Sequence, residues 1–133
     1  MNRALALDRL AARLSELAGV PVDLERPNDP EHGDYATNVA LQTAPQHKRP
    51  PREFAAELAE RATGLEEIER AEVAGPGFLN LWVTKEWLAG ALAEIGPGYG
   101  GGAAGERRQK IQVELISANP AGPLTVGSAR NGA

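Results

Sequence analysis

The sequence predicts an α+β fold, with an N-terminal domain of about four helices packed on a small antiparallel sheet, followed by the first strand and turn of a second, α/β domain. Two observations predict this order. Helix-like and strand-like periodicities alternate as far as residue 95, and a glycine-rich stretch then separates them from a last strand that stops at Asn-Pro and Gly-Pro. We therefore expect a domain over residues 1–95, a linker over 96–109 and the beginning of the second domain over 110–133.

Length and composition are those of a small globular protein. The 133 residues are enough for one domain with its own core, and 42% hydrophobic and 24% charged residues are ordinary values. No apolar run is long enough to span a bilayer and there is no signal-peptide core, so we expect a cytoplasmic location and no membrane partner. Because cysteine is absent, there is no disulfide framework and no thiolate metal site, and we assign no metal ligands.

The formal net charge of -4 argues mildly against binding nucleic acid by electrostatics alone. Two short basic clusters, at 47–52 and 107–110, still allow a local basic patch in an acidic chain. Each cluster taken alone is more typical of a solvated loop than of a binding surface.

Leucines at helical spacing predict a first helix, which Gly19 and Pro21 end. These leucines are Leu7, Leu10, Leu14 and Leu17. Alternation of apolar and polar residues over 20–25 then predicts a short strand, which Pro27 and Pro30 end.

Residues 30–41, P-E-H-G-D-Y-A-T-N-V-A-L, predict a turn that leads into a helix as far as about Ala44. His32 invites a catalytic interpretation, but a lone histidine beside Gly-Asp is more typical of a turn or a helix cap. Pro50 and Pro51 then predict the start of another helix, which ends at 63–64. We expect its inward side chains to be Phe54, Ala55, Leu58 and Ala59.

Residues 71–74 and 78–83 predict two strands joined by Gly75-Pro76-Gly77 as a hairpin. Alternation sends three side chains to the core and three to the opposite face: Leu79, Leu81 and Val83 inward, Phe78, Asn80 and Trp82 outward. An aromatic ring beside an amide suits stacking on an unpaired base and hydrogen bonding of its edge. Spacing alone favours the alternative, in which Phe78 and Trp82 pack beneath the helices.

Thr84 is expected to cap a helix that runs through Ile95 and is closed by Gly96 and Pro97. The apolar stripe of this helix comprises Trp87, Leu88, Ala91, Leu92 and Ile95. The glycine-rich residues 96–105 have no side chains to build a core, so we interpret them as linker. They are not a phosphate loop, because no lysine followed by Ser or Thr stands at the required spacing.

Ile111, Val113 and Leu115 alternate with polar residues and predict the last strand, which breaks at 119–120 and again at 122–123. Small residues after the break would let a ligand approach backbone N–H groups where a helix begins, as at nucleotide sites of open α/β sheets. Spacing alone favours the alternative, in which Asn-Pro and Gly-Pro form an ordinary turn that binds no ligand.

Three motifs follow one another along the chain: H-G-D-Y-A-T-N-V-A from His32, G-P-G-F-L-N from Gly75 and S-A-N-P-A-G-P-L from Ser117. In order and spacing they resemble the arginyl-tRNA synthetases, a class I aminoacyl-tRNA synthetase family. The resemblance implies the family's N-terminal tRNA-binding domain, followed by the start of its Rossmann-like, nucleotide-binding catalytic domain. In the family the first motif lies far from the reaction, and the G-P-G-F turn contacts the D-loop of the tRNA.

The resemblance assigns the contacts with arginine-accepting tRNA to four residues of the hairpin. Phe78 would stack on a nucleotide and Asn80 would read the edge of its base, while Gly75 and Gly77 would leave room for the nucleotide.

The resemblance also implies an arginine-tRNA ligase, which joins arginine to its tRNA with ATP and magnesium and holds no tightly bound cofactor. It places Glu114, Ser117 and Asn119 around the arginine, Gly127, Thr125 and Ser128 at the ATP, and Thr125 and Ser128 in the catalytic positions. In the family these two positions hold histidines, which stabilise the charge that develops on the phosphate. At about 1–3 kcal/mol for each lost contact, the reaction would be roughly ten to a few hundred times slower. We expect the 133-residue chain by itself to be inactive.

Two other interpretations stay open. The first is a free-standing, catalytically inactive tRNA-binding module, which the two substituted histidines permit. The second is a structural or interaction domain with no RNA role, which only the acidic net charge favours.

Overall fold

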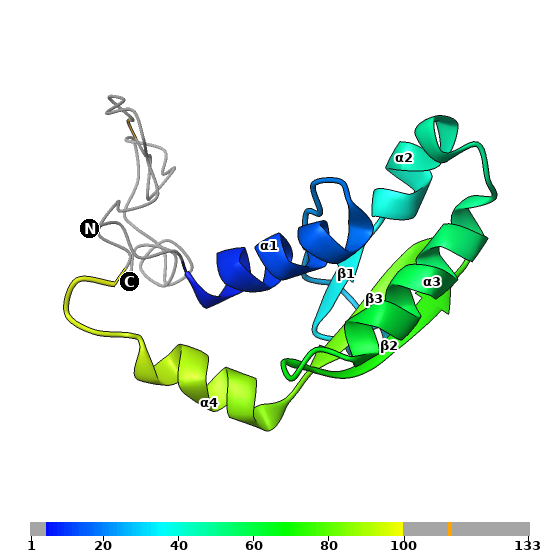
Figure 1. The fold of residues 1–133 in the computed structure, drawn as a ribbon. Coiled ribbons are helices and arrows are strands. Elements are labelled where there is room, and N and C mark those ends of the chain that lie inside the picture. Colours follow the sequence, from blue (N-terminus) through cyan, green and yellow to red (C-terminus); the bar gives the residue numbers. More distant parts are fainter. Residues whose placement is uncertain (1–4, 100–111, 113–133) are drawn as a thin grey trace, which may run out of the picture.

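A central strand, β3, organises the part of the chain that the computed structural model describes, which is residues 5–99 and 112 (Figure 1). Within 5–99 the chain forms four α-helices, one 3-10 turn and one three-stranded antiparallel sheet, which confirms the α+β class. The elements are α1 (Ala6–Ala18), the 3-10 turn (Pro30–His32), β1 (Tyr35–Thr37), α2 (Val39–His47), α3 (Pro51–Thr63), β2 (Ile68–Ala74), β3 (Phe78–Val83) and α4 (Lys85–Ala93). The expected second domain and most of the expected linker lie outside the described residues.

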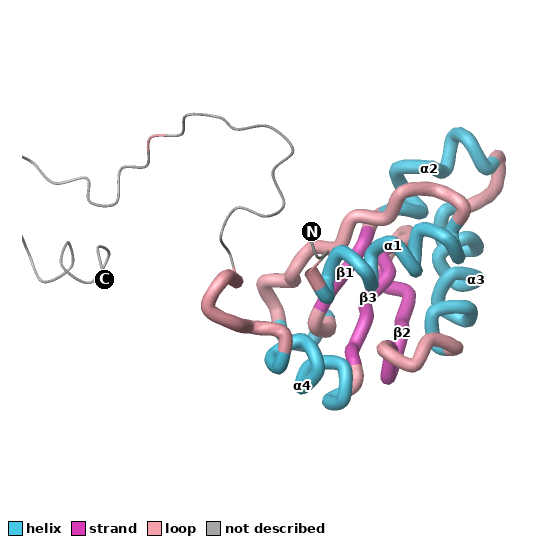
Figure 2. Tube along the Cα trace, turned by 60° about the vertical axis from the view of Figure 1, so that its left-hand side comes forward, coloured by secondary structure: helices cyan, strands magenta, loops and turns pink. Residues whose placement is uncertain are grey.

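The sheet has the order β1-β3-β2, so β3 is paired on both sides. Helix α3 packs on β2 and β3, and α1 and α2 pack on α3, as Figures 1 and 2 show. The core lies between these helices and the sheet, and its largest fully buried side chains are Leu10, Leu14, Val39, Leu58, Leu79 and Leu81. The predicted inward residues of α3 and the aliphatic face of β3 are therefore confirmed.

The end of α1 follows the sequence prediction. Gly19 adopts a left-handed conformation with φ 71°, and its N–H donates to the carbonyl of Ser15 at 2.8 Å. The chain then turns back, because the N–H of Val22 donates to the hydroxyl of Ser15 at 2.9 Å. This hydrogen bond pairs the backbone N–H of Val22 with α1 instead of with a strand, and the side chain of Val22 is buried.

Two predictions about the first half of the chain are wrong. The strand expected over 20–25 does not form, because Val22 bonds to α1 and only Glu25 makes a single bridge, with Ala36. The strand β1 lies within the segment that we expected to form a turn and the start of a helix. Helix α2 therefore begins only at Val39, and it continues to His47. Three residues are too short to show a period, and the partner of β1 lies more than forty residues further along the chain.

The Gly-Asp pair of the first motif locks β1 against β3. Gly33 has φ 91°, and a Cβ atom there would lie 2.6 Å from the carbonyl oxygen of Leu81. Next to it, the N–H of Asp34 donates to Leu81 O at 2.9 Å, and the carboxylate of Asp34 accepts from the N–H of Val83 at 2.9 Å. His32 ends the 3-10 turn before this lock, as the structural interpretation expected.

Helix α4 only partly matches its prediction. The hydroxyl of Thr84 caps it by accepting from the N–H of Trp87 at 3.2 Å, as expected. The helix ends at Ala93, and no residue of it is fully buried. Of its apolar stripe, Trp87 packs against the core, whereas Leu88, Leu92 and Ile95 are exposed.

Gly33→Ala should destabilise the domain by about 2 kcal/mol or more, because it adds strain at positive φ and a clash with backbone. Urea unfolding followed by circular dichroism measures this. Gly90→Ala is the matched control, since it lies inside α4 with nothing within 4 Å of the added methyl, and it should stabilise by up to about 1 kcal/mol. Equal stability of the Gly33→Ala variant and the wild type would contradict the lock between β1 and β3.

Candidate nucleic-acid interface

The hairpin turn Gly75-Pro76-Gly77 is held from the side by the beginning of α3. A Cβ atom on Gly77 would lie 2.9 Å from Cβ of Pro51, so only glycine fits at this approach. The guanidinium of Arg52 donates to the carbonyl oxygen of Gly75. Gly77 therefore lies against α3. Because the turn is held in this way, the backbone that leads into Phe78 has a defined position.

Phe78 and Asn80 lie on the outer face of β3, away from the helices. Phe78 is 42% exposed, so it does not pack beneath the helices. Asn80 is only 7% exposed, and among the described residues nothing hydrogen bonds to its side-chain amide. Its cross-strand neighbours are Ala36 and Glu72, which leave the amide between a small residue and a carboxylate. The amide atoms are not fully enclosed, because the described buried side-chain atoms that lack a partner are His47 Nε2 and Glu67 Oε2. An amide that reaches the surface and has no internal hydrogen bond can pair with a ligand, which makes Asn80 a candidate ligand contact.

Trp82, the third outward residue of β3, has a different environment. The guanidinium of Arg70 lies 3.7 Å from the centre of its ring, and Arg70 also pairs with Glu72 at 3.3 Å. One face of this ring is therefore already occupied. Phe78 is the aromatic side chain of β3 that remains free to stack.

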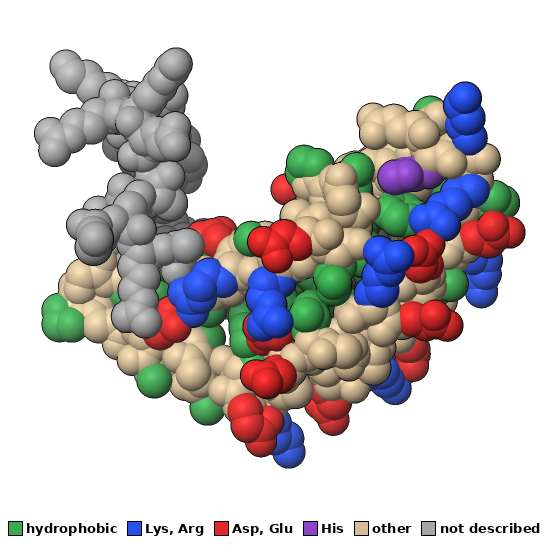
Figure 3. All heavy atoms as spheres, in the orientation of Figure 1, with side chains coloured by type: hydrophobic (Ala, Val, Ile, Leu, Met, Phe, Trp, Pro, Cys, Tyr) green, Lys and Arg blue, Asp and Glu red, His purple; other side chains and the backbone are tan. Residues whose placement is uncertain are grey.

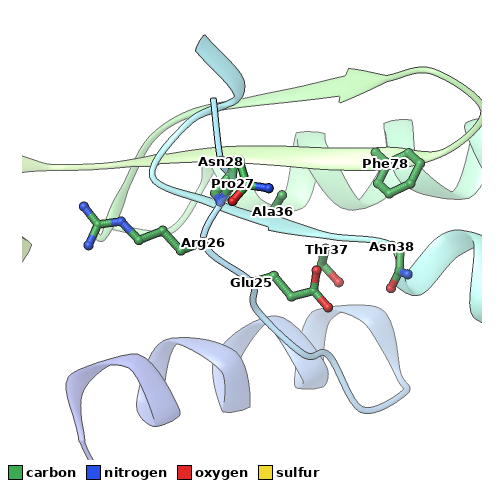
Figure 4. Close-up of a pocket in the computed structure, with 8 residues that line it drawn as sticks. All are labelled: Glu25, Arg26, Pro27, Asn28, Ala36, Thr37, Asn38 and Phe78. Carbon is green, nitrogen blue, oxygen red and sulfur yellow. The ribbon is translucent and has the colours of Figure 1, made fainter. Parts of the chain in front are cut away.

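A pocket of about 160 Å³ lies beside Phe78. Its walls come from residues 25–28, residues 36–38 and Phe78, which are far apart in sequence. Figure 4 shows Phe78 and Asn38 at one end of it and the side chain of Arg26 pointing away at the other. A cavity of about 150 Å³ holds a benzene ring, so this volume is sufficient for one aromatic ring.

The pocket brings together two of the sequence motifs. Asn38 belongs to the H-G-D-Y-A-T-N motif and Phe78 to the G-P-G-F-L-N motif, and pairing of β1 with β3 places them side by side. Asn38 and segment 25–28 were not predicted as site residues. The sequence did indicate that Asn38 belongs to the first motif. It did not show that β1 pairs with β3, which is what places Asn38 beside Phe78.

The basic cluster at 47–52 lies near the same turn, and its charges are partly used within the protein. Arg49 donates to Glu57 at 2.6 Å and lies over the ring of Phe54, while Arg52 holds the turn. The hydrogen bond from Arg49, with the charges of Arg49 and Arg61, lowers the pKa of Glu57 below its ordinary value of 4.5. Figure 3 shows basic and acidic side chains interspersed around the α2–α3 end of the molecule. The second basic cluster, at 107–110, lies outside the described residues.

Other kinds of site find no support in the part of the chain that the structure covers. Residues 5–99 and 112 contain no group of three His, Asp or Glu side chains placed to hold a metal ion. The helices formed by these residues are also too short or too polar to cross a membrane. The residues expected to hold arginine and ATP, which are Glu114, Ser117, Asn119, Thr125, Gly127 and Ser128, lie outside the described ranges.

Fold and geometry together define a class of protein. It is a small α+β domain whose sheet presents an exposed ring, an unpartnered amide and a ring-sized pocket, features that suit an unpaired base. The family described as the arginyl tRNA synthetase N terminal domain matches residues 5–83, and the chain belongs to this family.

Individual relatives agree with this family. The chain is 43% identical to an arginine–tRNA ligase of Chlorobium limicola over 116 residues, and 41% identical to that of Dechloromonas aromatica over 133 residues. These matches cover 84% and 98% of this chain. The solved structure of the Thermus thermophilus arginyl-tRNA synthetase is similar over 95% of this chain, with a TM-score of 0.52 and 29% sequence identity.

The chain is much shorter than these proteins. It covers 21% of the Chlorobium relative, 22% of the Dechloromonas relative and 21% of the Thermus chain. The described domain therefore corresponds to a small N-terminal part of them.

Asn80→Val should raise the free energy of unfolding by about 1 kcal/mol, because a β-branched apolar residue replaces an amide that has no partner. Thr37→Val is the matched control. Thr37 is also a buried polar residue, but its hydroxyl accepts from the N–H of Val39 at 3.2 Å, so its loss should destabilise by about 1 kcal/mol. Chemical denaturation measures both changes, and a clearly destabilised Asn80→Val variant would show that the amide has a structural role.

Proposed function

We propose that this chain is the tRNA-binding N-terminal part of an arginine–tRNA ligase and that it binds an unpaired nucleotide of the tRNA D-loop. The observation that carries the proposal is the exposed ring of Phe78 next to the unpartnered amide of Asn80 and the ring-sized pocket. Family membership and the names of the relatives support the same assignment.

In this proposal the two side chains divide the work of recognition. A base stacked on Phe78 gains about 1–3 kcal/mol whatever its identity. The amide of Asn80 supplies both a donor and an acceptor, so it prefers a base edge with the complementary pattern. Because the amide has no hydrogen-bond partner within the described domain, binding the right base breaks no internal hydrogen bond.

Electrostatic attraction has a secondary role in the proposal. The chain carries a formal net charge of -4, so non-specific attraction to phosphates is weak. Lys48 is exposed at the end of α2, near the turn held by Arg52, and is suited to a phosphate contact. Specificity then depends on the base and the loop shape rather than on charge.

The proposed reaction of the complete ligase joins arginine to tRNA with ATP and magnesium. A carboxylate oxygen of arginine attacks the α-phosphorus of ATP, pyrophosphate leaves, and the activated arginine passes to the tRNA. We assign Glu114 to the guanidinium, Ser117 and Asn119 to the bound arginine, and Gly127, Thr125 and Ser128 to the ATP. The S-A-N-P-A-G-P-L motif supports these assignments, and tRNA charging would place the protein in the cytoplasm.

A catalytically inactive tRNA-binding module is the second candidate. The observation that favours it is the presence of Thr125 and Ser128 at the two positions that are histidines in the family. Hydroxyl groups donate a hydrogen bond to a phosphate but bring no positive charge.

Phe78→Ala should weaken binding of this chain to arginine-accepting tRNA by roughly 5- to 150-fold, which is the loss of one stacked base. Asn80→Ala should weaken it similarly and should reduce discrimination against a tRNA whose D-loop bases are altered. Fluorescence titration at a fixed salt concentration measures both. Tyr99→Ala removes another exposed aromatic residue as a control and should bind like the wild type. Equal, weak and salt-sensitive binding by every variant would refute base recognition at this turn.

Thr125→His with Ser128→His, introduced into the full-length ligase, should raise the rate of arginyl-adenylate formation by roughly tenfold or more. The physical reason is that an imidazolium adds positive charge next to the phosphates. Arginine-dependent exchange of pyrophosphate into ATP measures this step, and a Lys85→Gln variant on α4 serves as a control that should not change it. An unchanged or lower rate would mean that the hydroxyls already supply what this site needs.

A further inference from the structure

Helix α4 presents two rows of side chains, one of which packs against the described domain while the other is largely exposed. In the first row, Trp87 packs against Tyr35 with ring centres 6.1 Å apart, and Glu94 pairs with Arg9 of α1 at 2.5 Å. The second row, which we name the α4 apolar face, consists of Leu88, Leu92 and Ile95. Its side chains are 41%, 67% and 52% exposed.

The members of the α4 apolar face are aligned along one side of the helix. Its members follow one another at spacings of four and three residues, so they lie along one side of the helix and of the turn after it. Figure 3 shows separate apolar side chains spaced along the edge of the molecule that α4 forms. Large aliphatic side chains aligned in this way mark a surface for another protein segment.

The position of α4 indicates which segment that is. The family match ends at Val83, so α4 follows the matched domain. It also lies at the end of β3 opposite the hairpin turn, where the described chain continues towards its C-terminus, as Figures 1 and 2 show. The relatives extend far beyond this region, because the chain covers only about a fifth of their length.

The spacing between α4 and the following domain favours contact. The sequence predicts a glycine-rich linker over 96–109, and a chain of that length and composition has a typical span of about 20 Å. A domain tethered so closely is present at an effective concentration in the millimolar range. We therefore expect the α4 apolar face to reach this domain without a bimolecular encounter.

We propose that the α4 apolar face is the docking surface for the catalytic body of the ligase, and this inference rests on the function proposed above. Docking there covers the second row of α4 while the first row stays joined to the tRNA-binding domain. The helix then acts as a rigid connection that sets the orientation of the Phe78 turn relative to the catalytic body. The D-loop contact and the delivery of the tRNA acceptor end are coupled through this orientation.

The test compares two variants of the full-length ligase. Leu88→Gln with Leu92→Gln and Ile95→Gln makes the α4 apolar face polar, and Ala89→Gln with Ala93→Gln changes exposed positions on another side of the same helix. Limited proteolysis within 96–109 reports on docking, because an undocked domain exposes the connecting segment. We expect cleavage of the first variant to be at least tenfold faster than that of the wild type, and cleavage of the second to be unchanged.

Two further measurements make the result unambiguous. The same substitutions in the 133-residue chain should leave its thermal unfolding and its tRNA affinity unchanged, since the replaced side chains are exposed and distant from Phe78. Equal cleavage of all full-length proteins would overturn the docking proposal while D-loop binding stood. Self-association of the wild-type chain in sedimentation, abolished by the triple variant, would also overturn it by assigning the face to a second copy.

Discussion

Pairing of β3 on both edges is the constraint on which the rest of this domain depends. The strand gives one face to the core, through Leu79 and Leu81, and the other to the surface, through Phe78 and Asn80. A shift of register by one residue would exchange these faces, placing an amide in the core and leucines at the surface. The same register that stabilises the fold therefore positions the ring and the amide of the proposed base-binding site.

Two glycine contacts protect this register. Gly33 allows β1 to approach Leu81 closely enough for the Asp34 hydrogen bonds, and Gly77 allows the hairpin turn to lie against α3. The motif around Gly33 thus has a structural role that also reaches the site, because β1 carries Asn38 to the pocket beside Phe78. Catalytic chemistry at the neighbouring histidine is not needed to explain why these residues occur together.

The chain combines an acidic composition with a proposed local site for an unpaired base. Two arginines at the surface are paired within the domain: Arg49 with Glu57, and Arg70 with the ring of Trp82. This arrangement reduces non-specific attraction to phosphate backbones, so in the proposed complex stacking and base-edge contacts would supply most of the affinity. The α4 apolar face lies at the other end of β3 from the hairpin turn, so the proposed base-binding site and the proposed docking surface are separate.

The sequence by itself determined the α+β class, the helix ends at Gly19 and Pro51, the hairpin and the two faces of β3, because these depend on local periodicity and turn chemistry. Only the tertiary structure decided the rest. The three residues of β1 acquire their strand conformation from a partner distant in the chain, and Val22 is held by α1 instead of a strand. Solvent exposure of Phe78 and the missing partner of the Asn80 amide likewise depend on which elements cover each face of the sheet, and spacing along the chain does not specify that.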